Sequence, residues 1–160
     1  MLNIVEEIIL SFTNNKFLYI GEGLTMSEHM IQTAMLAKKK CSDDLICSSL
    51  LHDYGYFVLD DPNKLVGYHI DGNHEAVGAN YLKKYLARDK KYFDDLSEAS
   101  KTSLKLQGGV MSDIETEQFK KNKNYENAIK LRRFDEGTKN LNIKIKKIEN
   151  YKELLLSKVI

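Results

Sequence analysis

The chain has 160 residues, the size of one domain, and its 42% hydrophobic residues are enough to form a buried core. Its 24 basic and 23 acidic side chains leave a net charge of +1, so the charge balance does not predict binding to nucleic acid or to a membrane surface. No stretch approaches the roughly 18 uninterrupted apolar residues of a membrane-spanning helix. The first ten residues lack the basic start of a signal peptide.

Two cysteines, Cys41 and Cys47, are six residues apart, a spacing that matches neither a redox pair nor a zinc motif. We therefore expect reduced thiols in a cytoplasmic protein. A single proline, Pro62, and the scarcity of alternating strand-like runs predict an all-α fold. Residues 140–146 are the ambiguous patch and could form a short strand.

Apolar periodicity and end signals predict seven helical segments. In chain order they are Leu2 to Phe12, Met26 to the lysines at 38–40, Asp43 to His52-Asp53, a helix beginning near His74, Leu96 to Leu106, Tyr125 to Glu136, and Tyr151 to Ile160. Thr25 with Glu28 and Ser112 with Glu115 have the form of capping boxes, and Ser42 is a further N-cap signal. We expect a loop between residues 55 and 73, which are rich in Asp, Asn and Gly.

The most informative feature is the adjacent pair His52-Asp53, which follows the apolar pair Leu50-Leu51 and precedes Tyr54-Gly55. An imidazole and a carboxylate at one helix end can bind the same metal ion, and the second carboxylate oxygen can bridge to another ion. Two polar groups at the edge of an apolar core need a partner, because their burial is otherwise costly. A metal ion would be a natural partner.

His29, His74 and Asp135 come from separate predicted helices, which could bring them to the same point. Imidazole and carboxylate ligands suit a borderline metal such as iron, manganese or zinc. Taken singly, each residue has a more ordinary explanation: a lone histidine is more often a core or surface residue, and Arg132 could form an intrahelical ion pair with Asp135. The combination predicts a metal-dependent, all-helical enzyme.

The segment from Leu50 to Gly55, with His29 upstream and Asp135 downstream, resembles the HD-domain superfamily. Members of this superfamily are helical bundles that bind metal through a His…His-Asp…Asp set; most are phosphohydrolases and some are oxygenases. The resemblance implies an all-α, HD-domain helical bundle that occupies residues 1–160 as a single domain, with a metal-binding core over about residues 17–140.

Further segments resemble one branch, the di-iron HD-domain oxygenases of organophosphonate catabolism. These segments are Tyr19-Ile20-Gly21-Glu22, Glu28-His29 with Gln32, His74-Glu75 with Val77-Gly78-Ala79 and Tyr81-Leu82, Leu96 to Ser100, Gln107-Gly108-Gly109 with Met111, and Lys130 to Glu136. The first and the fifth are not general features of HD domains, so they discriminate this branch. The resemblance implies a mixed-valence di-iron enzyme that uses dioxygen to cleave the carbon–phosphorus bond of a 1-hydroxyphosphonate, as in the conversion of 2-amino-1-hydroxyethylphosphonate to glycine and phosphate.

Carried over by position, this resemblance implies a role for ten residues. The first iron would be held by His29, His52, Asp53 and Asp135. Asp53 would bridge to a second iron, which His74 also binds. Tyr19 and Glu22 resemble the mobile pair that closes the substrate pocket. The contacts for the phosphonate and nearby groups would be Ser100, Gln107 and Arg132. The planar guanidinium of Arg132 suits a phosphonate dianion.

The sequence departs from the branch after the helix led by His74. The family has another helix there, with a histidine for the second iron and a lysine for the phosphonate. This chain instead goes almost directly from Tyr85 to Tyr92, and it has no histidine after His74. The second ion would then keep only Asp53 and His74, so one ion rather than two is an open alternative. A real deletion, an incomplete sequence, or a wall supplied by another chain would each explain the gap.

Two other residues bear on the assignment: Tyr56 stands where the phosphonate oxygenases can carry a histidine, and His69 is a spare histidine in the predicted loop, which we expect not to be a ligand. Two other functions stay open. One is a phosphohydrolase in which a single metal ion lowers the pKa of a bound water. The other is a non-catalytic derivative with an incomplete second site. The sequence leaves open the oligomeric state, the metal and the phosphonate.

Overall fold

A computed structural model describes residues 3–16, 18, 23–39, 41–59, 74–82, 85, 113–138 and 142–159. Their helices are α1 (Ile4–Asn14), α2 (Met26–Ala37), α3 (Asp43–Leu51), α4 (Gly55–Val58), α6 (His74–Leu82), α8 (Asp113–Lys120), α9 (Tyr125–Glu136), the 3₁₀ helix η1 (Ile148–Tyr151) and α10 (Lys152–Leu156). Within these ranges the sole strand-like pairing is an isolated bridge between Leu18 and Thr25. The predicted all-α fold is confirmed.

The starts of the first three helices follow from their capping residues. The side-chain oxygen of Asn3 accepts a hydrogen bond from the backbone amide of Glu6 at 3.0 Å, and the Glu6 carboxylate accepts one from the backbone amide of Asn3 at 3.2 Å. Thr25 and Glu28 form the predicted capping box of α2, in which the amide of Thr25 donates to the Glu28 carboxylate at 2.7 Å. Ser42 caps α3 as predicted.

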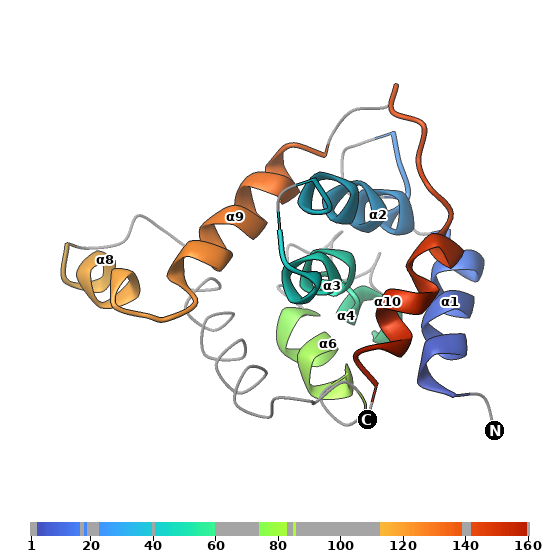
Figure 1. Cartoon of the computed structure of the whole chain (residues 1–160), viewed down its shortest axis with the longest axis horizontal. Coiled ribbons are helices and arrows are strands. Elements are labelled where there is room, and N and C mark those ends of the chain that lie inside the picture. The colour runs from blue at the N-terminus through green and yellow to red at the C-terminus, as the bar shows by residue number, and fades with distance from the viewer. Residues whose placement is uncertain are drawn as a thin grey trace.

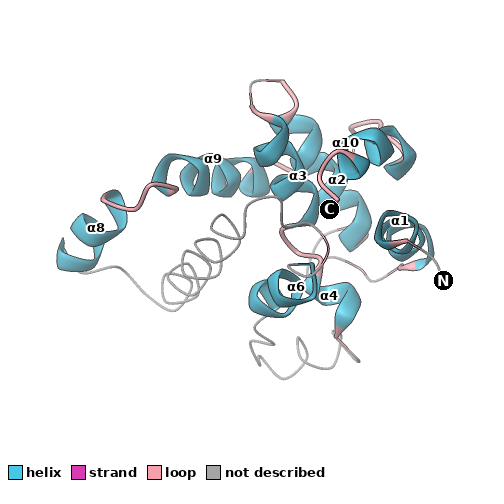
Figure 2. Ribbon diagram, turned by 60° about the horizontal axis from the view of Figure 1, so that its bottom comes forward, coloured by secondary structure: helices cyan, strands magenta, loops and turns pink. Residues whose placement is uncertain are grey.

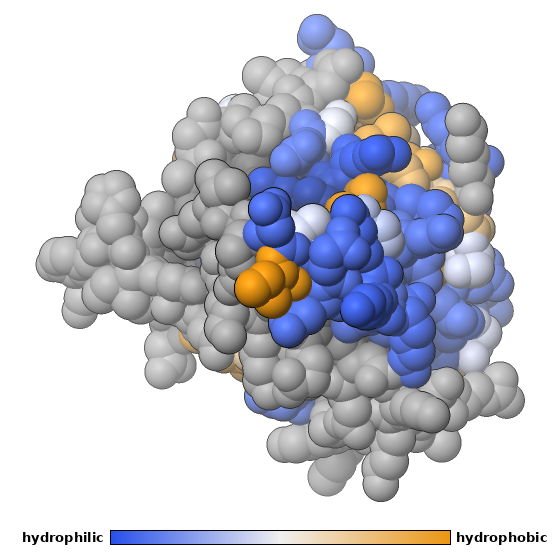
Figure 3. Space-filling view, turned by 90° about the vertical axis from the view of Figure 1, so that its left-hand side faces the viewer, coloured by the Kyte–Doolittle hydropathy of each residue, from blue (hydrophilic) through white to orange (hydrophobic). Residues whose placement is uncertain are grey.

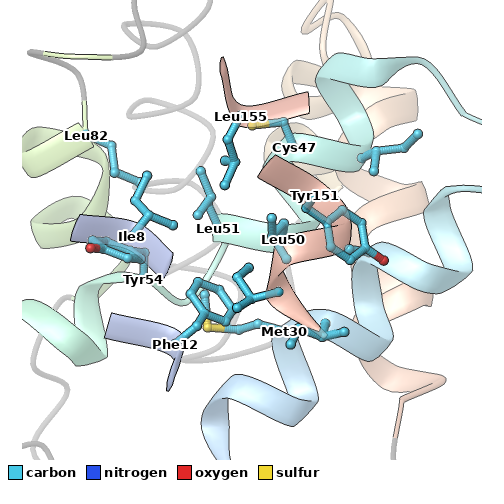
Figure 4. Close-up of a cluster of buried hydrophobic side chains, with 14 of the residues drawn as sticks. Ile8, Phe12, Met30, Cys47, Leu50, Leu51, Tyr54, Leu82, Tyr151 and Leu155 are labelled. Carbon is cyan, nitrogen blue, oxygen red and sulfur yellow. The ribbon is translucent and has the colours of Figure 1, made fainter. Parts of the chain in front are cut away.

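The core lies where α2 and α3 pack together, with α1 and the C-terminal pair η1 and α10 against one side and α9 against the other (Figure 1). Leu50 and Leu51 lie at the centre of the apolar cluster shown in Figure 4. Five different helices contribute side chains that are at most 1% exposed, among them Val5, Ile8, Met30, Leu50, Tyr151 and Leu155. The residues that lead into His52-Asp53 are therefore anchored in the core, which fixes the position of that pair.

Hydrogen bonds between side chains attach α1 to the segment that carries the site. Tyr54 is only 1% exposed, and its hydroxyl lies 3.1 Å from Oγ of Ser11. The hydroxyl of Tyr81 on α6 donates to the carboxylate of Glu7. The aromatic ring of Phe12 packs edge-on against Phe57 at a centroid distance of 5.2 Å. α1 therefore supports both α4 and α6 from one side.

Helices α4 and α6 cross at two glycines without space for a side chain. A β-carbon on Gly55 would lie 1.7 Å from the carbonyl oxygen of His74, and one on Gly78 would lie 2.7 Å from the amide nitrogen of Gly55. Both obstacles are backbone atoms, so neither contact could be relieved by a side-chain rotation. This crossing sets the distance between Asp53, which precedes α4, and His74, which begins α6.

α8 lies away from the other labelled helices and is joined to α9 by a short turn (Figures 1 and 2). An edge-to-face contact between Phe119 and Tyr125, with centroids 5.2 Å apart, connects the two helices. On the left-hand side of the molecule in Figure 1, which faces the viewer in Figure 3, the described surface at the centre is mainly hydrophilic. None of the described helices has the length and apolarity that crossing a membrane would require.

Two sequence predictions need correction. The predicted loop after Tyr54 begins with the helical turn α4, because Tyr54 and Phe57 pack on Phe12 and this tertiary contact outweighs the local composition. The last helix is shorter than predicted and ends at Leu156, where Oγ of Ser157 bonds the carbonyl of Leu154.

The possible strand at 140–146 is absent over the described residues 142–146, which are not paired with another segment in a sheet. The predicted helix over residues 96–106 and the capping residue Ser112 lie outside the described residues.

Candidate metal centre

Four helices bring the predicted ligands to one place. His29 lies on α2, one turn after its N-cap, and its side chain is completely buried. His52 and Asp53 form the turn that follows α3. Asp135 lies in the last turn of α9, and His74 is the first residue of α6. The convergence predicted from sequence is thus present in the structure.

Three donor atoms, from His29, His52 and Asp53, lie close together, and Asp135 approaches the two histidines. Nε2 of His29 lies 3.0 Å from Oδ1 of Asp135 and 3.5 Å from Oδ2 of Asp53. Nε2 of His52 lies 3.3 Å from Oδ2 of Asp53 and 3.7 Å from Oδ1 of Asp135. The two Nε2 atoms are 3.2 Å apart. Ligand atoms about 2.1 Å from one ion are about 3.0 Å apart in an octahedral arrangement and about 3.4 Å apart in a tetrahedral one. The spacing of the donors of His29, His52 and Asp53 fits a shared transition-metal ion, and Oδ1 of Asp135 lies beside this group.

Outer contacts fix which ring nitrogen of each histidine faces the cluster. Nδ1 of His52 lies 2.9 Å from the carbonyl oxygen of Ser49, which can only accept, so Nδ1 carries the proton. Nδ1 of His29 lies 2.9 Å from Oγ1 of Thr138. Neutral rings bonded in this way direct two Nε2 lone pairs at each other, and the lone pairs repel. A cation between them would remove this repulsion.

The electrostatics of the cluster also favour added positive charge. Burial lowers the pKa of His52, but the carboxylates of Asp53 and Asp135 outweigh burial and raise it to about 9. Burial likewise opposes a charged His29, yet hydrogen bonds to Asp135 and Asp53 raise its pKa. Burial would raise the pKa of Asp53, but His52, His29 and His74 hold it well below its usual range. Two ionised carboxylates therefore need counter-charge here, from protons or from a metal ion.

Asp53 faces the second candidate position with its other oxygen. Nε2 of His74 lies 3.2 Å from Oδ1 of Asp53, whereas Oδ2 faces His29 and His52. The ring of His74 stacks on Tyr56 at a centroid distance of 4.1 Å, and its Nδ1 lies 3.5 Å from Oε2 of Glu75. The arrangement suits a bridging carboxylate, with one imidazole on the second side.

Arg132 forms the intrahelical ion pairs that its spacing suggested. Its Nη1 lies 3.2 Å from Oδ2 of Asp135, and its Nε lies 3.1 Å from Oε1 of Glu136. The side chain is 55% exposed. Because Oδ1 of Asp135 faces the histidines, Arg132 lies at the outer edge of the cluster of candidate ligands. Its role as a phosphonate contact stays a prediction.

Four other predicted site residues lie outside the described residues: Tyr19, Glu22, Ser100 and Gln107. The same holds for His69, and for most of the segment between residues 83 and 95, where the sequence departs from the family. Sequence reasoning missed Thr138 and the carbonyl of Ser49, which contact the two histidine rings. A threonine after a helix and a backbone carbonyl carry no recognisable motif, so only their position in the fold reveals them.

Comparison with known proteins agrees with this geometry. The HD-domain family model matches residues 26–148. The hydroxymethylphosphonate dioxygenase of Gimesia maris is 34% identical over 83% of this chain and 77% of the relative. A [1-hydroxy-2-(trimethylamino)ethyl]phosphonate dioxygenase (glycine-betaine-forming) of Leisingera caerulea is 38% identical over 76% of this chain and 72% of the relative. An uncharacterised protein, L432, of Acanthamoeba polyphaga mimivirus is 31% identical over 86% of this chain and 73% of the relative.

The chain therefore belongs to the HD-domain family, in the group of HD-domain oxygenases represented by these two dioxygenases. The resemblance read from the His-Asp pair and its neighbouring segments is confirmed. The matched range contains all five candidate ligands.

Proposed function

We propose that this protein is an iron-dependent dioxygenase that cleaves the carbon–phosphorus bond of a small 1-hydroxyphosphonate. The observation that carries this proposal is the Asp53 carboxylate, whose two oxygens face imidazoles on opposite sides. The names of the two dioxygenase relatives support the reaction and the class of substrate.

The donor set fits iron. Three imidazoles and two carboxylates are nitrogen and oxygen ligands of the kind that iron accepts, and two carboxylates balance the charge of a divalent ion. The residues that would bind the first ion are His29, His52, Asp53 and Asp135. The second ion would be bound by Asp53 and His74. Bound iron would activate dioxygen and polarise the substrate. Whether one or two ions bind is part of the proposal to be tested.

The reaction balances without an external reductant. A 1-hydroxyphosphonate and one molecule of dioxygen have the same atoms as a carboxylic acid and inorganic phosphate. The carbon–phosphorus bond breaks, the carbinol carbon is oxidised to a carboxyl group, and dioxygen accepts four electrons. Each product gains one oxygen atom.

The residues around the centre have separable tasks. Hydrogen bonds to Ser49 and Thr138 orient His52 and His29, and these contacts keep both Nε2 atoms directed at the cluster. Arg132 adds positive charge beside Asp135, where an anionic substrate group would be attracted. We assign pocket closure to Tyr19 and Glu22, and further phosphonate contacts to Ser100 and Gln107, from their resemblance to the family.

The direct test is oxygen-dependent phosphate release. Protein purified without oxygen is loaded with Fe(II) and mixed with hydroxymethylphosphonate, 2-amino-1-hydroxyethylphosphonate or the trimethylamino analogue, and then with oxygenated buffer. We expect oxygen uptake and phosphate release in equal amounts with at least one substrate. The control is Asp135→Asn, which keeps the shape of the side chain but removes its charge. Absence of oxygen uptake with every substrate would contradict the proposal.

One observation favours a second function, a phosphohydrolase. The tight cluster formed by His29, His52 and Asp53, with Asp135 beside it, could hold one ion without help from His74. A single ion that lowers the pKa of a bound water can promote attack on a phosphoester. Metal-dependent hydrolysis of p-nitrophenyl phosphate under nitrogen, without oxygen-dependent cleavage of any phosphonate, would support this second function. A wild-type protein that binds clearly less than one metal ion per chain would indicate a non-catalytic derivative.

A further inference from the structure

Thr138 lies two residues beyond α9 and is completely buried. Its hydroxyl oxygen Oγ1 lies 2.9 Å from Nδ1 of His29 and 2.6 Å from the backbone carbonyl oxygen of Asp135. One side chain therefore contacts two of the candidate ligands, which are 106 residues apart in the sequence and lie on different helices.

The number of protons settles the direction of these two hydrogen bonds. A threonine hydroxyl has one proton, and a carbonyl oxygen can only accept, so the proton of Thr138 goes to Asp135. Oγ1 then accepts from the ring of His29, which must carry its proton on Nδ1. The other ring nitrogen, Nε2, faces Asp135 and His52, so it is the nitrogen that would bind a metal ion in place of a proton.

We propose that Thr138 is a positioning residue that holds His29 in its metal-binding tautomer and orientation. This inference rests on the metal centre of the proposed function and extends it. Thr138 also anchors the backbone of Asp135 at the end of α9, so the same hydroxyl group sets the relative position of a ligand on α2 and a ligand on α9. Outer contacts of this kind typically change metal affinity by roughly 10- to 100-fold when they are removed.

The chain contains a matched control for this role. Thr33 is also completely buried, and its hydroxyl also bonds His29, but it donates to the backbone carbonyl oxygen of His29 at 3.0 Å. The Thr33 hydroxyl therefore bonds the backbone of His29, whereas the Thr138 hydroxyl bonds its ring. Replacing each threonine by valine removes one buried hydroxyl with little change in side-chain volume. Only Thr138→Val removes the oxygen that accepts the hydrogen bond from Nδ1 of His29.

The experiment measures Zn²⁺ affinity by competition with a chromogenic chelator for the wild type, Thr138→Val, Thr138→Ser and Thr33→Val. We expect Thr138→Val to bind Zn²⁺ roughly 10- to 100-fold more weakly than the wild type. Thr138→Ser keeps the hydroxyl group and should bind nearly as tightly as the wild type. Thr33→Val should also stay close to the wild type. Equal affinity for Thr138→Val and the wild type would overturn the proposal, as would equal losses in both valine variants.

A second readout does not depend on affinity. In Zn²⁺-loaded protein labelled with ¹⁵N-histidine, the wild type and Thr138→Ser should show a solvent-protected proton on Nδ1 of His29. That signal should broaden or shift in Thr138→Val. A protected signal that is unchanged in Thr138→Val would overturn the proposal even if this variant were less stable.

Failure of the proposed reaction and failure of this inference are distinguishable. A chain that binds Zn²⁺ and shows the expected series, but that releases no phosphate with iron and dioxygen, would contradict only the dioxygenase activity. A chain that releases phosphate, but whose Thr138→Val variant binds Zn²⁺ like the wild type, would contradict only the role of Thr138. A wild-type chain that binds no ion would overturn both.

Discussion

Asp53 and His74 face each other at the edge of the cluster, with Oδ1 of the carboxylate 3.2 Å from Nε2 of the imidazole. The other oxygen of Asp53 lies 3.3 Å from Nε2 of His52. A single carboxylate thus separates a set of buried donors on one side from one imidazole on the other. This relationship makes the two halves of the site separable by mutation.

Replacing His74 by alanine should remove the second ion and leave the first. The donors of the first position do not include His74, whereas the second position would keep only one oxygen of Asp53. In the two-ion case, elemental analysis of protein prepared without oxygen should show about one ion per chain fewer in His74→Ala than in the wild type.

His69→Ala is the matched control, since it removes a histidine that we do not expect to be a ligand. It should keep the wild-type metal content. Loss of all bound metal in His74→Ala would show that the two positions are not separable. If the wild type itself binds one ion, His74→Ala should leave that content unchanged.

Gly78→Ala should displace α6 relative to α4. The new methyl group would lie 2.7 Å from the amide nitrogen of Gly55, a backbone atom that cannot rotate away. Overpacking of this kind typically costs about 1–3 kcal/mol of unfolding free energy. Since α6 carries His74, the second position should also bind its metal ion more weakly, while the first position is less affected. Urea unfolding and elemental analysis measure the two effects.

Asn80→Ala, an exposed substitution on the same helix, should change neither quantity. A Gly78→Ala protein with wild-type stability would mean that the crossing has more room than the backbone contacts indicate. Unchanged metal content in a destabilised Gly78→Ala protein would separate the crossing from the position of His74.

Arg132→Gln tests whether this residue binds substrate or only pairs within its helix. Exposed intrahelical ion pairs typically contribute about 0.5 kcal/mol or less, so the loss of pairing with Asp135 and Glu136 should hardly change the melting temperature. If Arg132 contacts the phosphonate, KM should rise at least about tenfold while metal content stays constant. Arg133→Gln, the same change at the next exposed position of α9, is the control. Equal KM values for both variants would exclude the substrate contact.

The sequence predicted those parts of the molecule that depend on local chemistry. Capping residues such as Thr25 and Ser42 determine where helices begin, and the apolar run before His52 determines which face is buried. Tertiary contacts determine the rest. The turn α4 forms because Tyr54 and Phe57 pack on Phe12, a residue more than forty positions earlier in the chain.

The same distinction applies to the candidate site. The ligand types could be read from His52-Asp53 and its partners, because metal binding restricts which side chains can serve. Thr138 could not, because its importance lies in a distance to His29 that the order of residues does not encode. The crossing of Gly55 and Gly78 is similar: the glycines are visible in the sequence, but their contact is not.

The two cysteines should react at very different rates in the folded protein. Cys47 is 7% exposed, and burial raises the pKa of its thiol to about 12, so little thiolate is present at neutral pH. Cys41 is only partly buried. We expect one rapidly modified thiol per chain with a chromogenic disulfide reagent, and two in denaturant. Cys41→Ser should abolish the rapid phase; a rapid phase that survives in this variant would place reactivity at Cys47.

Removing the metal should make stability depend on pH in a defined direction. Burial lowers the pKa of His52, but Asp53 and Asp135 outweigh burial and raise it from 6.5 to about 9. A group whose pKa is raised on folding stabilises the protein below its unfolded pKa and loses that contribution as the pH rises through its folded pKa. The contribution of His52 is therefore complete below pH 6.5 and lost near pH 9, and a shift of this size corresponds to an energy on the order of 3 kcal/mol.

The carboxylates act in the opposite direction. The histidines hold the pKa of Asp53 below its ordinary value of 3.8 despite burial, so its contribution is present above pH 3.8 and is lost on acidification. The metal-free protein should be most stable between about pH 4 and pH 6.5 and should weaken towards pH 9. A bound metal ion replaces the proton as counter-charge, so the metal-loaded protein should keep its stability over the alkaline part of this range. Urea unfolding from pH 4 to pH 9, with and without a chelator, measures both curves. Metal-free stability that increases from pH 6.5 to pH 9 would contradict the proposed charge balance of the cluster.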